Sequence, residues 1–160
     1  YERNKLDKIY PYYGAASILD YVDKYLFDGI YILMGEDGSV VTPDGFPILQ
    51  YVSGKFWVNN HAHVIKGKNG FDENSIYLLL SNLKIGDIIT GGVQGKINQE
   101  NLNSILVCIP KLFVIQEFNQ KIKGLFNNFV IIKKDILLLE DFRQVLLSKM
   151  SKIPVEVLTK

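Results

Sequence analysis

A repeat of apolar residues in the last third of the chain is the feature that most constrains its fold. From residue 115 onward, apolar side chains recur at alternating intervals of three and four residues. The members of this series are Ile115, Phe118, Ile122, Leu125, Phe129, Ile132, Ile136 and Leu139. Such spacing predicts an α-helix with an apolar stripe of the coiled-coil type. Pro110 precedes the stripe and Pro154 follows it, so we expect one helix over residues 113–151 and a short tail over 152–160.

The expected helix is too long to be covered by the rest of the chain. Arg143 occupies the next position of the repeat, but Phe142, Leu146 and Met150 continue the stripe with a small shift. Roughly 35 helical residues span about 50 Å, which is more than a domain of about 110 residues can cover. The stripe therefore predicts a partner helix, from another chain or from another part of the same protein. A helix that packs only on the core of its own domain is the alternative.

Composition places a structural boundary just ahead of this helix. The chain has 160 residues with 18 basic and 17 acidic side chains, so it lacks the basic excess typical of nucleic-acid-binding proteins. Residues 1–110 carry 9 basic and 12 acidic side chains, a net charge of −3, whereas residues 111–160 carry 9 and 5, a net charge of +4. Of the 13 glycines, 12 lie at or before Gly95. We therefore expect a turn-rich domain over residues 1–112.

Turn signals and short apolar runs alternate in this first part of the chain. Asp-Gly pairs at residues 28–29, 37–38 and 44–45 predict turns. Segments of β-rich composition cover residues 30–34, 47–52, 55–65, 87–90 and 106–109. We expect a helix over residues 75–83 with Asn74 as its N-cap, and a short helical turn over 98–105 capped by Asn98. The predicted fold class is α+β, with an irregular, mostly β domain followed by a long, coiled-coil-forming α-helix.

Two histidines raise the hypothesis of a metal site. In a strand, His61 and His63 lie on the same face, and two imidazoles at this spacing could bind a metal ion. They are the only histidines, Cys108 is the only cysteine, and a catalytic zinc ion needs a third protein ligand. We therefore favour histidines that hydrogen-bond within the domain or to a ligand, and we expect no metal site. A metal-dependent hydrolase that uses His61 and His63 remains an alternative function.

Three clusters of polar and aromatic residues lie on segments that are rich in glycine or asparagine. They cover residues 10–17, 59–61 and 91–98. Asn and Gln side chains pair with adenine and Lys pairs with guanine at the base edges of DNA, and glycine lets the backbone approach a ligand closely. These clusters are therefore candidates for nucleic-acid contact, although turns of purely structural role have a similar composition.

Several motifs taken together resemble a known family. The run YPYYGA at residues 10–15 leads into DYVDKYLFDG at 20–29, then GEDGS at 35–39 and SGKFWVNNHAHV at 53–64. The succession closes with QGKIN at 94–98 and with Ile109-Pro110 ahead of the long helix. It resembles a target recognition domain from the specificity subunit of a type I restriction–modification system, and the resemblance covers nearly the whole chain.

This resemblance implies a non-enzymatic subunit that binds double-stranded DNA and reads one half of a split target. Its partners would be methyltransferase subunits, which bind S-adenosylmethionine and methylate adenine, and restriction subunits, which translocate and cut DNA. S-adenosylmethionine, ATP and Mg are expected only in those partners, and no cofactor is expected in this chain. With one recognition domain and one helix, the chain is expected to be either a half-size subunit that dimerises through the helix or a fragment that pairs with a second recognition domain.

The resemblance and the clusters together define the expected site residues. The expected DNA-facing set is Tyr12, Tyr13, Gly14, Ala15, Lys55, Asn60, His61, Gln94, Lys96 and Asn98. The expected helix seam is the apolar series from Ile115 to Leu139, continued by Phe142 and Leu146. The single cysteine and the lack of an apolar run long enough to span a membrane predict a cytoplasmic protein. A coiled-coil protein-interaction module, in which the helix itself is the function, is a further alternative.

Overall fold

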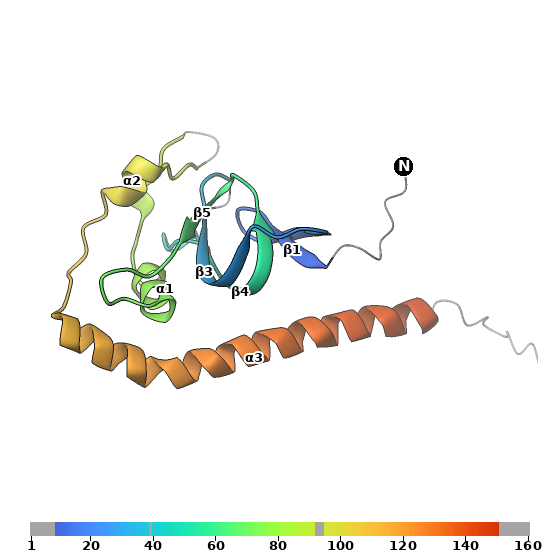
Figure 1. The fold of residues 1–160 in the computed structure, drawn as a ribbon. Coiled ribbons are helices and arrows are strands. Elements are labelled where there is room, and N and C mark those ends of the chain that lie inside the picture. The colour runs from blue at the N-terminus through green and yellow to red at the C-terminus, as the bar shows by residue number, and fades with distance from the viewer. Residues whose placement is uncertain (1–8, 39, 92–94, 151–160) are drawn as a thin grey trace, which may run out of the picture. The chain divides into compact units, whose positions relative to one another are not determined.

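The computed structural model of the chain describes residues 9–38, 40–91 and 95–150. The chain divides into two compact units, unit 1 over Tyr1–Ile122 and unit 2 over Lys123–Lys160. The division falls inside the long helix, so the first turns of that helix belong to unit 1. Figure 1 gives the order of the elements along the chain. None of the helices in the described part has the length and hydropathy needed to cross a membrane.

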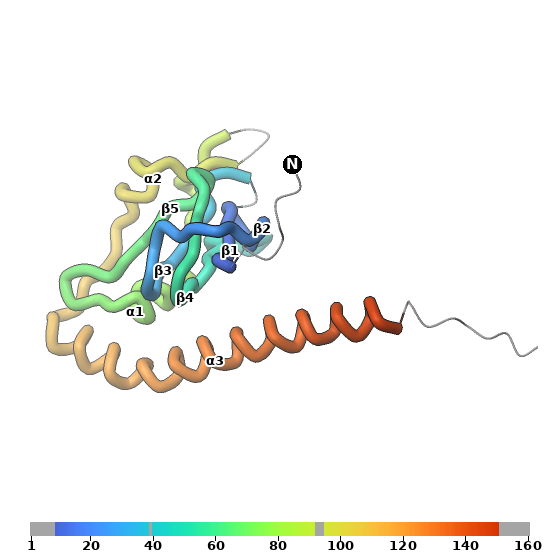
Figure 2. Tube along the Cα trace, turned by 45° about the vertical axis from the view of Figure 1, so that its right-hand side comes forward, coloured from blue at the N-terminus to red at the C-terminus, as the bar shows by residue number. Residues whose placement is uncertain are grey.

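Unit 1 is built on a mixed sheet of five strands. These are β1 (Tyr10–Tyr13), β2 (Ile18–Val22), β3 (Phe27–Gly35), β4 (Leu49–Val58) and β5 (Ala62–Ile65). Their order across the sheet is β2-β1-β4-β3-β5, and only the contact between β1 and β4 is parallel. Figure 2 traces the path of the chain through these strands. The predicted α+β class, with a mostly β domain and a long helix, is confirmed.

A pair of facing glycines bends the two longest strands. Gly29 in β3 lies opposite Gly54 in β4, and both have positive φ angles, 133° and 91°. A residue with a Cβ atom rarely adopts such angles, so glycine is needed at both positions. Beyond Phe56, the last residue paired with β3, β4 continues and pairs in parallel with β1 through Trp57 and Val58. One strand thus connects the two halves of the sheet.

The core lies on both faces of β3. Leu33 belongs to one buried cluster together with Val52 and Phe56, whereas its neighbour Met34 belongs to a second cluster with Ile97. Successive side chains of a strand point to opposite faces, so β3 is covered on both sides. Three aromatic rings of the first cluster surround Phe56, with centroid distances of 5.3–5.7 Å to Phe27, Tyr13 and Tyr31.

Two of the predicted strands are wrong. Residues 87–90 begin in a 3-10 helix, η2 (Gly86–Ile88), and only Thr90 forms an isolated bridge, to Lys96. Residues 106–109 form no strand, and the side chain of Leu106 is 95% exposed. Ile88 and Ile89 pack against the second core cluster instead of entering a ladder. The β-rich composition of residues 87–90 and 106–109 is therefore not a sign of strand pairing. In the first segment it serves the core, and in the second Leu106 is exposed.

The helices agree closely with expectation except at one cap. Helix α1 spans Glu73–Ser81, and its N-cap is Asp72, whose Oδ1 accepts a hydrogen bond of 2.8 Å from Ser75 N. The predicted cap, Asn74, lies inside the first turn, and its Oδ1 accepts from the Tyr51 hydroxyl. Helix α2 spans Gln99–Asn103 and is capped by Asn98, as predicted. Helix α3 spans Leu112–Met150, within one residue of the predicted ends.

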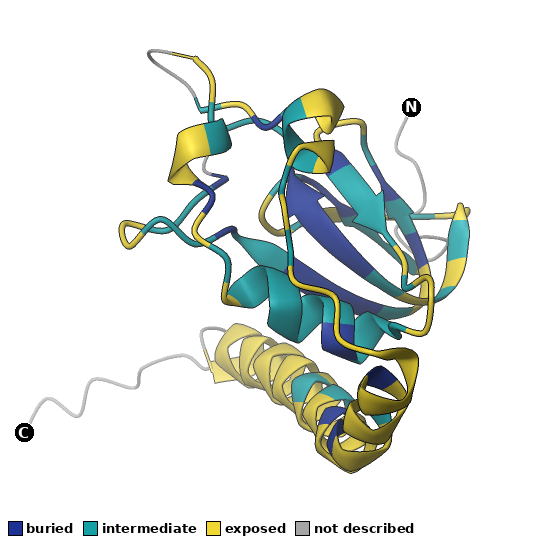
Figure 3. Cartoon of the chain, turned by 90° about the vertical axis from the view of Figure 1, so that its left-hand side faces the viewer, coloured by how far each residue is buried: buried dark blue, intermediate teal, exposed yellow. Residues whose placement is uncertain are grey.

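The two parts of α3 have different surroundings. In the part within unit 1, Ile115 and Ile122 are only 4% and 7% exposed, and Asn119 Nδ2 donates to Gly70 O at 2.8 Å. Ile115 and Ile122, two residues of the expected helix seam, are thus already covered within the chain. Beyond Ile122, most side chains of α3 are exposed, as the yellow helix in Figure 3 shows.

Candidate nucleic-acid interface

The turn between β4 and β5 lies against the turn that follows β3. Glu36 N donates a hydrogen bond of 2.8 Å to His61 O, which joins the two backbones. The side chains meet as well, because His61 Nδ1 lies 2.7 Å from Asp37 Oδ2. Within the first turn, Asn59 Oδ1 accepts from His61 N at 3.0 Å. We call residues 36–38 the acidic turn, and it is the centre on which the other segments converge.

The segment that precedes α2 lies on the other side of the acidic turn. Ile97 N donates to Glu36 O at 2.7 Å, and Gly38 N donates to Gly95 O at 3.1 Å. Lys96 Nζ lies 3.4 Å from Glu36 Oε1. The predicted cluster at 59–61 and the described part of the predicted cluster at 91–98 therefore meet, although more than 30 residues separate them in sequence.

The third predicted cluster, at residues 10–17, reaches the same place. Asn59 N donates to Tyr13 O at 3.1 Å, and buried Gln50 donates from Nε2 to Gly14 O at 2.9 Å. Ala15 lies so close to Gly35 that a Cβ atom on Gly35 would be 2.9 Å from Ala15 O. Two of the clusters thus contact the acidic turn directly, and the third adjoins it through Asn59 and Gly35. We call the surface formed there by Ala15, Asn60, His61, Lys96 and Asn98 the polar rim.

Side chains of the polar rim are accessible to different degrees. Asn60, His61 and Lys96 are exposed, whereas Ala15 and Asn98 are half-buried. Asn98 Oδ1 already accepts a hydrogen bond of 2.7 Å from Asn101 N as the cap of α2. Asn60, His61 and Lys96 are therefore the exposed residues of the rim, and amide, imidazole and ammonium groups can all hydrogen-bond to base edges or phosphate oxygens.

Four of the predicted DNA-facing residues lie away from the polar rim. Tyr13 is a core residue, and burial together with nearby Tyr21 raises the pKa of its hydroxyl to about 12. Gly14 is buried, and a Cβ atom there would come 2.7 Å from a methyl group of Leu19. Tyr12 is half-buried between β2 and β4.

The fourth, Lys55, has partners of its own within the sheet. Its Nζ lies 4.7 Å from the centre of the Tyr25 ring, and Asp28 is directly opposite across the β3–β4 ladder. Gln94, which was also predicted to face DNA, lies outside the described residues. The polar rim therefore holds five of the ten predicted residues.

The acidic turn prevents a positive excess at the polar rim. Lys96 pairs with Glu36 and His61 with Asp37, and all four side chains are at least a quarter exposed. Exposed ion pairs of this kind stabilise a fold by about 0–1 kcal/mol, so their main effect is to orient the two basic side chains. Because the rim carries no positive excess, it offers little long-range attraction for a polyanion.

The two histidines have separate roles. His63 Nε2 donates to Ile97 O at 2.7 Å, since a carbonyl oxygen can only accept, and this bond ties β5 to the segment before α2. His61 is held by Asp37. Within the described residues there is no group of three or more His, Cys, Asp or Glu side chains placed to bind a metal ion. Nothing in this part of the chain supports the metal-dependent hydrolase.

Sequence reasoning did not identify the residues that hold the polar rim together. Glu36 and Asp37 appear in the sequence as an ordinary turn, and Gln50 as one polar residue in an apolar strand. Gln50 could have been recognised because it is polar at a strand position where a buried residue is expected. Buried amides are hydrogen-bonded, so such a position predicts a specific partner. Its exposure is 9%, and its partner is the backbone of residue 14.

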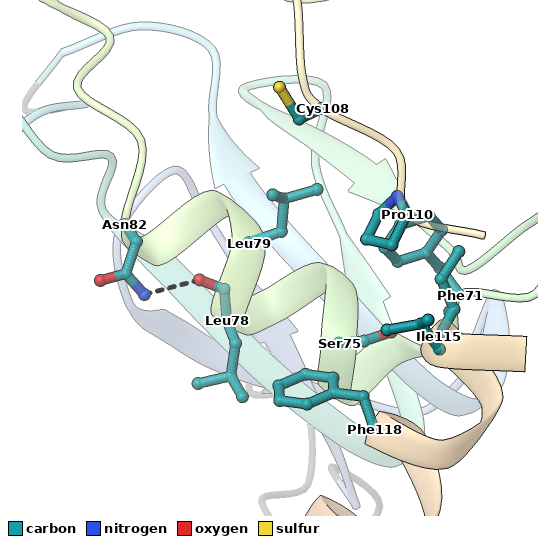
Figure 4. Close-up of a pocket in the computed structure, with 10 residues that line it drawn as sticks. Phe71, Ser75, Leu78, Leu79, Asn82, Cys108, Pro110, Ile115 and Phe118 are labelled. Carbon is teal, nitrogen blue, oxygen red and sulfur yellow. Dashed lines mark hydrogen bonds between the residues drawn. The ribbon is translucent and has the colours of Figure 1, made fainter. Parts of the chain in front are cut away.

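An apolar cavity of about 470 Å³ lies elsewhere in unit 1. Figure 4 shows its lining, which comes from α1, the segment before α3 and the first turns of α3. Leu78 and Leu79 face it from α1, Cys108 and Pro110 border it, and Phe118 closes it from α3. No residue of the polar rim lines this cavity, so the two features are distinct.

Comparison with known proteins gives two matches. The family model described as the type I restriction modification DNA specificity domain matches residues 2–140. A protein of Haemophilus influenzae with the provisional name of type I restriction enzyme specificity subunit S.HindORF215P is 38% identical over 107 residues. The aligned region covers 67% of this chain and 27% of that relative. The chain thus spans about a quarter of the length of the curated relative that it matches.

Proposed function

Because the chain belongs to the family of type I restriction modification DNA specificity domains, we propose that unit 1 reads one half of a bipartite DNA target. The observation that carries this proposal is the convergence of three polar segments on the acidic turn. Side chains that are far apart in sequence there form one accessible surface of amide, imidazole and ammonium groups. A rigid sheet supports this surface, and such support is what a base-reading site requires.

Each exposed residue of the polar rim has a chemical role in this proposal. Asn60 offers a carboxamide, which can bond to both N6 and N7 of adenine, and Lys96 offers an ammonium group for guanine or phosphate. His61 donates from Nδ1 to Asp37, so Nε2 of the neutral ring is an acceptor. Asp37 and Glu36 then act as positioning residues that orient His61 and Lys96.

The same proposal explains why unit 1 needs partners. Without a positive excess at the rim and with a net charge of −3 over residues 1–110, a single domain would bind DNA weakly, because phosphate neutralisation supplies most non-specific affinity. We propose that the second half-site and the partner subunits supply the missing affinity. The partners would be methyltransferase subunits with S-adenosylmethionine and restriction subunits with ATP and Mg, and this chain would be non-catalytic and without a cofactor.

We further propose that α3 is both spacer and assembly element. Beyond Ile122 the helix exposes large apolar side chains such as Leu125, Leu139 and Phe142, at 69%, 65% and 60%. Exposed apolar stripes on long helices are typical of helix–helix interfaces. The partner helix would come from a second recognition domain or from a second copy of this chain. We place the assembly in the cytoplasm, where DNA and the partner subunits would be found.

A methylation map tests the proposal for unit 1. The protein is co-purified with its methyltransferase subunits, and the adenines that become methylated in a genomic library are sequenced. Asn60→Ala and Lys96→Gln should each lower the methylation rate at the preferred sites or relax the half-site, since each lost base contact costs about 1–3 kcal/mol. Asn103→Ala and Lys68→Gln, at exposed positions outside the polar rim, are the matched controls.

The outcome that contradicts the proposal is equally specific. If both rim variants methylate the same sites at the wild-type rate while remaining folded and bound to the methyltransferase, the polar rim does not read DNA. Zinc or manganese in stoichiometric amount in the purified chain would favour the hydrolase alternative instead.

A further inference from the structure

The two histidines of the chain hydrogen-bond through different ring nitrogens. His61 Nδ1 lies 2.7 Å from Asp37 Oδ2, and an ionised carboxylate only accepts, so the proton of the neutral His61 ring is on Nδ1. His63 Nε2 lies 2.7 Å from Ile97 O, which also only accepts, so the proton of His63 is on Nε2. The side chain of His61 is 51% exposed, whereas His63 is half-buried. His61 therefore presents an accessible ring whose second nitrogen, Nε2, is an acceptor.

The position of the His61 ring is fixed from several sides. Asn59 Oδ1 accepts from His61 N at 3.0 Å, and Glu36 N donates to His61 O at 2.8 Å, so the backbone is held before and after the side chain. Asp37, which holds the ring, is itself held by a backbone bridge to Lys96. Within the described residues, no group is hydrogen-bonded to His61 Nε2. The structure thus positions one ring nitrogen and leaves it open to a ligand.

We infer that His61 reads an amino base, adenine or cytosine, at one position of the half-site, and that Asp37 is the positioning residue that sets this preference. The inference rests on the proposed function of the polar rim and specifies the base class for one of its residues. In the major groove, N6 of adenine and N4 of cytosine are donors, whereas guanine and thymine present only acceptors. An acceptor nitrogen therefore bonds to an amino base and is repelled by the oxygen of a keto base.

The bond to Asp37 gives the histidine a selectivity that the ring alone lacks. A neutral imidazole can present either a donor or an acceptor, so an unrestrained His61 could bond to either class of base. With its proton held on Nδ1 by Asp37, the ring presents an acceptor only. Lys96 differs, because an ammonium group has donors only and selects guanine or a phosphate. The two basic side chains of the polar rim are thus complementary in hydrogen-bonding polarity.

Nitrogen NMR of the histidine rings in the full chain tests the position of the proton. At pH 8, the ring shifts should show the proton of His61 on Nδ1 and that of His63 on Nε2. Asp37→Asn should move the His61 proton toward Nε2, because a carboxamide can donate to Nδ1, and it should leave His63 unchanged. Asp44→Asn, at an exposed position in another Asp-Gly pair, is the matched control. A wild-type His61 ring with its proton on Nε2, or with protons on both nitrogens, would overturn the inference.

A methylation map over a randomised half-site tests which base is read. The protein is co-purified with its methyltransferase subunits, and the methylated members of the DNA library are sequenced. One position should favour adenine or cytosine over guanine and thymine by about tenfold, and His61→Lys, which has donors only, should invert this preference. Asp37→Asn should reduce the preference to less than about threefold while the other positions keep theirs. Asp44→Asn should leave the whole map unchanged.

The outcomes separate this inference from the proposed function of the polar rim. If Asn60→Ala and Lys96→Gln change the map but His61→Lys does not, the rim reads DNA and the inference alone is overturned. The same holds if the position that responds to His61→Lys is guanine or thymine in the wild-type map. If none of the rim variants changes the map, the proposed function fails as well. Unchanged fluorescence of Trp57, the only tryptophan, shows that unit 1 remains folded in each variant.

Discussion

Unit 1 and the part of α3 in unit 2 use apolar residues in opposite ways. In unit 1, Leu33 and Met34 are adjacent in β3, and both are fully buried on opposite faces of the sheet. In unit 2, Ile136 and Leu139 are equally apolar, yet they are 51% and 65% exposed. Unit 1 thus buries its apolar side chains in a core, whereas unit 2 leaves most of its large apolar side chains exposed. The difference shows that apolar content alone does not determine which side chains are buried within the chain.

The largest expected effect is the difference in stability loss between a phenylalanine of unit 1 and a phenylalanine of unit 2. Phe56→Ala removes the ring at the centre of the aromatic cluster and should lower the free energy of unfolding of unit 1 by about 3–5 kcal/mol. Phe142→Ala, at a side chain that is 60% exposed, should change it by less than about 0.5 kcal/mol. Denaturant unfolding followed by Trp57 fluorescence measures both. An equal loss of unfolding free energy in the two variants would show that Phe142 contributes to the stability of unit 1 as Phe56 does.

A smaller effect distinguishes two isoleucines of the same apolar repeat. Ile115→Ala should cost unit 1 about 2–4 kcal/mol, because Ile115 is buried in it. Ile132→Ala should leave that value nearly unchanged and instead weaken self-association, since its side chain is 57% exposed. Denaturant unfolding of dilute samples measures the stability of unit 1, and analytical sedimentation measures self-association. A large loss of unit 1 stability in Ile132→Ala would show that Ile132 is part of the core.

The cap of α1 gives an intermediate prediction. Asp72→Ala removes the side chain that accepts from Ser75 N, so it should cost about 1 kcal/mol. A nine-residue helix depends on such caps more than α3 does, because α3 is 39 residues long. Asp23→Ala, at an exposed position in unit 1, is the control. If both variants unfold at the same denaturant concentration as wild type, Asp72 is not a stabilising cap.

The smallest effect is a loss of stability of unit 1 at alkaline pH. Burial raises the pKa of Tyr13 from 10.0 to about 12, so between these pH values the unfolded chain releases a proton that the folded chain retains. Stability is therefore fully present below pH 10 and falls as the pH rises toward 12, by an amount on the order of 1 kcal/mol. Tyr13→Phe should show a flatter decline over this interval. An unchanged slope would mean that Tyr13 ionises normally in the folded protein.

Expectations from sequence succeeded where the signal is local. The ends of α3, the cap of α2 at Asn98 and the strands of the 30–34 and 47–52 segments follow from periodicity, composition and capping within a few positions. The turn predicted at residues 28–29 is wrong, because Asp28 and Gly29 lie inside β3 and pair with β4. The misassigned cap at Asn74 is also a local error, because Asp72 and Asn74 both carry a side-chain oxygen near the start of α1. The hydrogen bond of Asn74 to Tyr51 decided between them.

Expectations failed or stopped short where contacts are distant in sequence. Residues 106–109 have a strand composition but no neighbouring strand to pair with, and Tyr13 lies in a polar, glycine-rich run but enters the core. The three polar clusters gave no sign that they would meet at Glu36 and Asp37. Their contacts join residues more than 20 positions apart, and loop closure over such lengths leaves no local pattern.

The sequence by itself determined the long helix, the mostly β character of unit 1 and the family of the chain. Helix periodicity, turn residues and motifs all act over short distances along the chain. The tertiary structure decided which part of the apolar repeat is covered and which is exposed, because that depends on whether α1 and the segment at Gly70 reach Ile115 and Asn119. It also decided that His61 and Lys96 lie beside the same turn, since His61 contacts Asp37 and Lys96 contacts Glu36. Packing between distant segments is the physical reason in both cases.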